Sequence, residues 1–280
     1  MILKRAAELD AMAAAARINR EALEAVEAVI GVGVTTAELN AVAEDAILSR
    51  GGKPAFKGYH GFPATLCTSV NEVVVHGIPD DRPLADGDIV SIDVGTWYGG
   101  YPADMARTYA IGEVSSDARR LMGATESSLY AGIAAMRPGN RLGDVSAAIQ
   151  SVVEEAGFWV VREFVGHGIG KEFHEAPNVP NFGTAGKGPL LRPGLVLAIE
   201  PMVSLRQTKV EVLEDGWTAP TADGSLAAHF EHTVAVTDDG PWVLTAPETD
   251  PRRGAQDDAR VSSGSADAEG RFGQEVKSGA

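Results

Sequence analysis

Two short apolar runs, each ending on a carboxylate, constrain this chain more than any other feature. Residues 87–93 read G-D-I-V-S-I-D and residues 194–200 read G-L-V-L-A-I-E, so Asp93 and Glu200 stand at the same position of two similar segments. Runs of Ile, Val and Leu of this length are typical of buried strands. An ionised carboxylate at the end of a buried strand costs several kcal/mol unless it is paired or coordinated. We therefore predict that both carboxylates point into one shared site that holds positive charge.

The segments before these runs repeat as well. Residues 1–30 have apolar residues at helical spacing, and the capping box T-T-A-E (35–38) begins a second helix that ends at a glycine pair (51–52). In the second half, helices are expected near 116–136 and from about 142 to 157. Each half thus reads as helix, turn, helix and strands. Such a repeat implies two halves packed about a pseudo-twofold axis, with the site between them.

A second acidic residue follows the first in each half. Asp93 leads through a Gly- and Tyr-rich turn to Asp104, and Glu200 leads across a longer loop to Glu231. If each pair lies on adjoining antiparallel strands, four carboxylates converge, and their mutual repulsion raises their pKa values unless divalent cations neutralise it. His167, in G-H-G-I-G, adds one nitrogen donor, and such an oxygen-rich set suits Mn²⁺, Fe²⁺ or Co²⁺ at least as well as Zn²⁺. Each residue alone is more typical of a structural role, and the combination favours a metal centre.

The composition excludes several other classes of function. A formal charge of −15 over 280 residues argues against a nucleic-acid partner, since phosphate contacts need clustered Lys and Arg. No apolar stretch is long enough to span a membrane, and the N-terminus lacks the apolar region of a signal peptide. The single cysteine, Cys67, forbids an intrachain disulfide and fits a cytoplasmic location. Residues 250–280 are rich in Gly, Ser and Ala, which predicts a disordered tail after a single domain of residues 1–249.

Six motifs, in order, resemble those of the type I methionine aminopeptidases, in their short bacterial form. The resemblance spans about Ala7 to Leu244 and implies the α+β pita-bread fold, in which two pseudo-twofold-related α/β halves surround a central antiparallel sheet. The motifs are V-H-G-I-P (75–79), S-I-D-V-G (91–95), A-D-M-A-R-T (103–108), G-H-G-I-G (166–170), I-E-P-M (199–202) and F-E-H-T (230–233).

The resemblance also implies how two divalent cations per chain, Co²⁺, Mn²⁺, Fe²⁺ or Zn²⁺, would be held. Asp104 and Glu231 would bridge them, Asp93 would complete the ligands of one, and His167 with Glu200 those of the other. Two cations that share ligands lower the pKa of bound water enough for it to attack a peptide carbonyl at neutral pH.

Catalytic roles and a substrate pocket follow from the same resemblance. Glu200 would shuttle the proton, His174 would donate a hydrogen bond to the developing oxyanion, and His76 would contact the scissile amide or the second residue. The methionine pocket would be lined by aromatic rings and a cysteine, against which a thioether packs well. These residues are Tyr59, Phe62, Cys67, Phe173 and Trp217.

The implied function is removal of the initiator methionine from nascent chains whose second residue is small. The protein is expected to be a cytoplasmic monomer, and the ribosome near the exit tunnel is a candidate partner. Two alternatives remain. An X-Pro aminopeptidase or dipeptidase of the same fold would share all five ligands, but usually has an additional N-terminal domain and lacks the pocket string from Tyr59 to Cys67. A non-catalytic pita-bread binding protein would have lost ligands, whereas this chain keeps all five together with His76 and His174.

Overall fold

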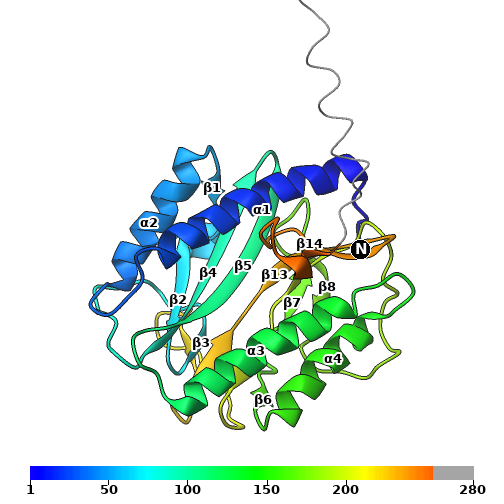
Figure 1. Cartoon of the computed structure of the whole chain (residues 1–280). Helices are drawn as coiled ribbons and strands as arrows, with labels where there is room; N and C mark the ends of the chain where they lie inside the picture. Colours follow the sequence, from blue (N-terminus) through cyan, green and yellow to red (C-terminus); the bar gives the residue numbers. More distant parts are fainter. Residues whose placement is uncertain (255–280) are drawn as a thin grey trace, which may run out of the picture.

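The computed structural model describes residues 1–254, and these contain the four long helices that the sequence predicts. Figure 1 shows the helices on one side of the strands, two over each half of the chain. The first pair is α1 (Ala6–Glu27) and α2 (Thr36–Ser49), and the second is α3 (Ser116–Ala134) and α4 (Leu142–Glu155). No helix within residues 1–254 is long and apolar enough to cross a membrane.

Helix α2 begins and ends where its sequence signals predict. Thr35 Oγ1 accepts a hydrogen bond from the Glu38 backbone N–H at 3.1 Å, and the Glu38 carboxylate accepts one from the Thr35 backbone N–H at 2.8 Å. The two bonds satisfy donors that the helix itself cannot pair. After Ser49 the chain reaches Gly51, whose φ of +76° is a left-handed conformation that glycine adopts without strain. The predicted capping box is therefore confirmed.

All paired strands of the described residues are antiparallel, and most belong to one sheet in each half. In the first sheet, β4 (Ile89–Tyr98) pairs with β1 (Lys53–Pro54), β2 (Leu66–Val70) and β5 (Tyr101–Ala110). The second has the order β14 (Gly240–Val243), β13 (His232–Thr237), β9 (Val196–Ile199), β7 (Gly166–Gly168), β8 (Glu175–Val179). Smaller sheets join β12 (Ala227–His229), β10 (Met202–Ser204) and β6 (Trp159–Val160), and β11 (Ala219–Pro220) with β3 (Val73–Val75).

The alternation of side chains along β4 decides to which face of the sheet the Asp93 carboxylate points. Val90, Ile92 and Val94 are fully buried in the apolar core beneath α1 and α2. Successive side chains of a strand point to opposite faces, so Asp93 points away from the helices. The expectation that Asp93 ends a strand is wrong, because β4 continues to Tyr98 and turns at Gly99-Gly100 into β5, which places Asp93 opposite Ala106.

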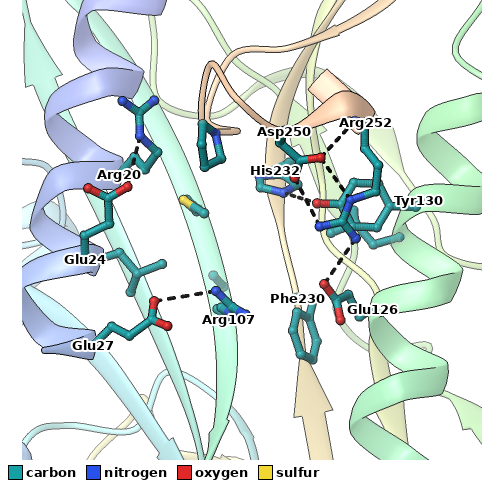
Figure 2. Close-up of a pocket in the computed structure, with 15 residues that line it drawn as sticks. Arg20, Glu24, Glu27, Arg107, Glu126, Tyr130, Phe230, His232, Asp250 and Arg252 are labelled. Atoms are coloured by element: carbon teal, nitrogen blue, oxygen red, sulfur yellow. Dashed lines mark hydrogen bonds and ion pairs between the residues drawn. The ribbon is translucent and has the colours of Figure 1, made fainter. Parts of the chain in front are cut away.

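Residues 250–254, which the sequence analysis assigns to the tail, pack against the domain instead. Pro251–Arg253 forms a short 3₁₀ helix (η2), and Figure 2 shows Arg252 between Asp250, Glu126 and Tyr130. The Arg252 guanidinium lies 3.9 Å from the centre of the Tyr130 ring and 3.5 Å from a Glu126 carboxylate oxygen. A hydrophobic pattern cannot reveal this anchor, because it rests on charge and stacking. The remainder of the predicted tail, 255–280, lies outside the described residues.

Replacing Arg252 with alanine is expected to lower the free energy of unfolding by about 1 kcal/mol, since an exposed Arg–aromatic contact contributes ~0.5–1 kcal/mol and an exposed ion pair adds little. Urea unfolding of the metal-loaded protein measures this. Arg119→Ala is the matched control, because Arg119 lies on the same helix as Glu126 and makes only an exposed ion pair with Glu113. Equal losses in the two variants would show that the stacking on Tyr130 contributes nothing.

Candidate metal centre

Every residue that the sequence analysis selects for the site lines a single cavity of about 520 Å³ between the two halves. Its floor is acidic, and its wall is aromatic. Phe56 and His60, which the sequence analysis does not select, also line it. The selected residues are Tyr59, Phe62, Cys67, His76, Asp93, Asp104, His167, Phe173, His174, Glu200, Trp217 and Glu231.

Imidazole and carboxylate groups meet at the floor of the cavity. His167 Nε2 lies 3.6 Å from Asp104 Oδ2 and 3.7 Å from Glu200 Oε1. The other ring nitrogen, Nδ1, is 2.9 Å from the Gly168 carbonyl oxygen. Nδ1 therefore carries the proton and donates a hydrogen bond to that carbonyl, which leaves the Nε2 lone pair directed at the carboxylates. Asp104, His167 and Glu231 each offer one ligand atom within 4.8 Å of the others, which is a spacing that a metal ion can span.

The electrostatics of this cluster call for positive charge. Burial raises the pKa of Asp104 to about 8, and burial together with the neighbouring carboxylates raises the pKa values of Asp93, Glu200 and Glu231 well above their usual range. Burial also lowers the pKa of His167 to about 4, so its imidazole is neutral. Asp93 Oδ1 and Glu231 Oε1 are buried without a hydrogen-bond partner. Unpaired buried carboxylate oxygens beside a neutral imidazole fit divalent cations.

Comparison with known proteins agrees with this chemistry. Residues 10–238 match the metallopeptidase family M24. The methionine aminopeptidase of Clostridium perfringens is 50% identical over 245 residues, covering 88% of this chain and 98% of that protein. Methionine aminopeptidase 1 of Mycobacterium tuberculosis is 51% identical over 247 residues, covering 86% and 93%. The chain belongs to the methionine aminopeptidases of metallopeptidase family M24.

The structural comparison confirms the predicted pita-bread fold for this M24 peptidase. The crystal structure of methionine aminopeptidase from Thermotoga maritima superposes with a TM-score of 0.87 at 46% identity and covers 88% of this chain and 100% of that one. A prolidase from Pyrococcus horikoshii superposes with a TM-score of 0.71, but it is 23% identical and only 64% of its chain is covered, so it shares the fold alone. The predicted metal-dependent hydrolase class is confirmed by the family.

The aromatic wall of the M24 cavity joins the metal centre through β2. Cys67 lies directly opposite Asp93 in the β2–β4 pairing and is buried among Phe56, Phe62 and Phe173. The Phe62 and Trp217 rings pack edge to face, with centroids 5.2 Å apart and ring planes at 77°. The pocket is therefore apolar and aromatic and directly adjoins the carboxylates.

Two further histidines face the cavity above the carboxylates. His174 Nδ1 lies 2.8 Å from the Tyr59 hydroxyl, and its ring centroid is 4.2 Å from that of His167. His76 has a φ of +60°, which is uncommon for a residue other than glycine and often marks a functional position. Burial lowers the pKa values of both histidines, that of His174 to about 4. Both imidazoles are therefore neutral and can donate hydrogen bonds.

Two threonine hydroxyls join the two halves at the metal centre. Thr233 Oγ1 accepts a hydrogen bond from the Asp104 backbone N–H at 2.9 Å and donates one to the Asp104 carbonyl at 2.8 Å. Thr108 Oγ1 does the same for the backbone of His229, at 3.0 and 2.8 Å. Between these clamps, the Glu231 backbone N–H donates to the Ala106 carbonyl at 2.8 Å. The hydroxyls thus fix Asp104 and Glu231 relative to each other.

Removing the Thr233 hydroxyl is expected to weaken metal binding by about 10–100-fold, the usual effect of losing a group that orients a ligand. Thr233→Val has nearly the same shape without the hydroxyl, and Thr233→Ser keeps the hydroxyl as the matched control. Calorimetric titration with Mn²⁺ gives the dissociation constants. If Thr233→Ser loses as much affinity as Thr233→Val, side-chain packing rather than the hydrogen bonds orients Asp104.

One buried histidine of the centre escapes the sequence analysis. His229 Nε2 lies 3.8 Å from Glu200 Oε2 and 3.9 Å from Glu231 Oε2, and burial lowers its pKa to about 3. His229 could have been predicted from its position two residues before Glu231, because residues i and i+2 of an extended segment point to the same face.

A second hollow, of about 200 Å³, lies behind the centre between α1 and α3 (Figure 2). His232 lines it and contacts Tyr130, with Nε2 3.1 Å from the hydroxyl. The guanidinium groups of Arg20, Arg107 and Arg252 are each paired with a carboxylate. Its charges therefore compensate one another, in contrast to those of the metal centre.

Proposed function

We propose that this peptidase removes the N-terminal methionine from new polypeptide chains in the cytoplasm, with preference for a small second residue, and that it holds two divalent cations. The observation that supports this most is the direct contact between an apolar aromatic pocket and a centre of four carboxylates, of which Asp104 and Glu231 are buried and the other two partly buried. An unbranched thioether side chain packs well on aromatic edges. With the methionine side chain in this pocket, the peptide bond to be cleaved would lie beside the carboxylates.

The residues of the centre divide between holding the cations and handling protons. Asp104 and Glu231 would bridge the cations, Asp93 would complete one ligand set, and His167 with Glu200 would complete the other. Bound there, the cations would polarise the substrate carbonyl and lower the pKa of a water molecule.

The remaining steps belong to the chain's own side chains. Glu200 would accept a proton from the attacking water and deliver it to the leaving amine. His174, held by the hydrogen bond between its Nδ1 and Tyr59, would donate from Nε2 to the oxyanion. His76 lies between Phe164 and Trp217, with ring centroids 5.4 and 6.4 Å away, and would orient the scissile amide or the second residue.

The decisive test compares two peptides across metals. The protein is stripped of metal and reloaded separately with Mn²⁺, Co²⁺, Fe²⁺ or Zn²⁺, and release of the first residue is measured from Met-Gly-Met-Met and from Gly-Pro-Ala. We expect metal-dependent release of methionine and an intact proline peptide. Cleavage of the proline peptide would instead assign the chain to the X-Pro enzymes, and no cleavage with any metal would assign it to the binding proteins.

A further inference from the structure

His229 stands at the end of β12 with its side chain turned toward the carboxylates. Only 2% of the residue is exposed, and Nε2 is buried without a hydrogen-bond partner. This nitrogen lies 3.8 Å from Glu200 Oε2 and 3.9 Å from Glu231 Oε2. Both distances are too long for a hydrogen bond. Nε2 therefore faces the space between the two carboxylates without bonding to either.

The distances from His229 match those of a residue already placed at the metal centre. His167 Nε2 lies 3.6 and 3.7 Å from its two carboxylate oxygens, which is nearly the same separation. Ligand atoms about 2.0–2.2 Å from a common cation fall 3–4 Å apart in tetrahedral or octahedral geometry. Glu200, His229 and Glu231 each offer one ligand atom within 4.8 Å of the others. The carboxylates of Glu200 and Glu231 thus face a second imidazole.

The pseudo-twofold arrangement gives an independent reason for this placement. Thr233 clamps the backbone of Asp104, and Thr108 clamps the backbone of His229, in each case through both the N–H and the carbonyl. Thr108 follows Asp104, and Thr233 follows His229, at the same separation along the chain. His229 therefore occupies in the second half the position that the ligand Asp104 occupies in the first.

We propose that His229 is a further metal ligand, whose Nε2 supplies a nitrogen donor to the cation held by Glu200 and Glu231. The proposal rests on the metal-dependent function above and extends its ligand set. Two imidazoles in the centre raise its preference for Co²⁺, Fe²⁺ and Zn²⁺ relative to Mn²⁺, because imidazole suits these cations better than carboxylates alone do.

Proton NMR of the Co²⁺-loaded protein tests this, because a paramagnetic ion shifts the N–H protons of bound imidazoles far downfield. We expect two shifted, solvent-exchangeable imidazole signals in the wild-type protein and one in His229→Leu. His232→Leu is the matched control, since His232 is a buried histidine on the opposite face, hydrogen-bonded to Thr245 and Tyr130, and both signals should remain. A single shifted signal in the wild-type protein would overturn the proposal without any variant.

Measurements of metal affinity distinguish whether His229 binds the cation or only donates a hydrogen bond. Calorimetric titration with Co²⁺ should show affinity about 10-fold weaker in His229→Leu. His229→Gln should remain weak, because its amide can still donate a hydrogen bond, whereas its carbonyl oxygen is a poorer ligand for Co²⁺ than an imidazole nitrogen. Full recovery in His229→Gln would overturn the proposal. The signal count does not depend on substrate, so it fails or succeeds separately from methionine release.

Discussion

Replacing either Asp104 or Glu231 with alanine is expected to abolish methionine release, with a loss of at least about 10³-fold and loss of both metals. Each carboxylate would serve two cations, so its removal opens both ligand sets. It also leaves the remaining buried carboxylates to repel one another without compensation. Peptide turnover and metal content of the purified variants, measured after loading with Co²⁺, check this expectation.

Two companion variants make this result specific. Asp104→Asn keeps the shape of the side chain and removes the charge, so it should lose metal while still folding. Asp88→Asn changes a largely buried carboxylate just before β4 that accepts hydrogen bonds from Asn71 and Ala85 and lies away from the centre, and this variant should keep its metal. Near-normal activity in either bridging variant would show that the bridging assignment is wrong.

The metal-free protein is expected to become less stable as the pH rises from 6.5 to 8. The folded-state pKa of Asp104 is about 8, well above its usual 3.8, so the folded state binds protons that the unfolded state has already released. Stability must then fall as the pH rises through this window. The buried histidines, whose pKa values are near 3 to 4, act in the opposite sense near pH 6.5, because an unfolded histidine is about half protonated there. Asp93, Glu200 and Glu231, whose pKa values are also raised, add to the fall that Asp104 produces. In a domain of this size each kcal/mol corresponds to roughly 2–4 °C in melting temperature.

Thermal melting of metal-free and Co²⁺-loaded protein at both pH values measures this effect. The loaded protein should melt at a similar temperature at pH 6.5 and 8, because cations take the place of the bound protons. Asp104→Asn should reduce the pH dependence of the metal-free protein, since it removes one of the titrating carboxylates. Identical pH dependence with and without metal would mean that the carboxylates do not repel one another as their burial implies.

Local signals sufficed for the parts of the fold that local physics decides. The capping box at Thr35, the glycine that ends α2 and the apolar run that begins β4 each act within a few residues, so the sequence predicts them correctly. The position of Asp93 within β4 was misjudged, because the strand continues through residues 94–98, which have no purely apolar pattern. Its length is set by pairing with β5 rather than by its own composition.

The sequence by itself predicted the residue types of the site, since two carboxylates in matching apolar runs and a glycine-flanked histidine already favour a bound cation. The tertiary structure alone decided how they are held together. The threonine clamps join residues more than 100 positions apart. Arg252 is anchored by the Tyr130 ring on α3, and His229 is recognised as a candidate ligand only because it faces the two glutamates. Hydrogen bonds, stacking and shared ligation depend on distances between remote segments, and such distances exist only once the two halves have packed.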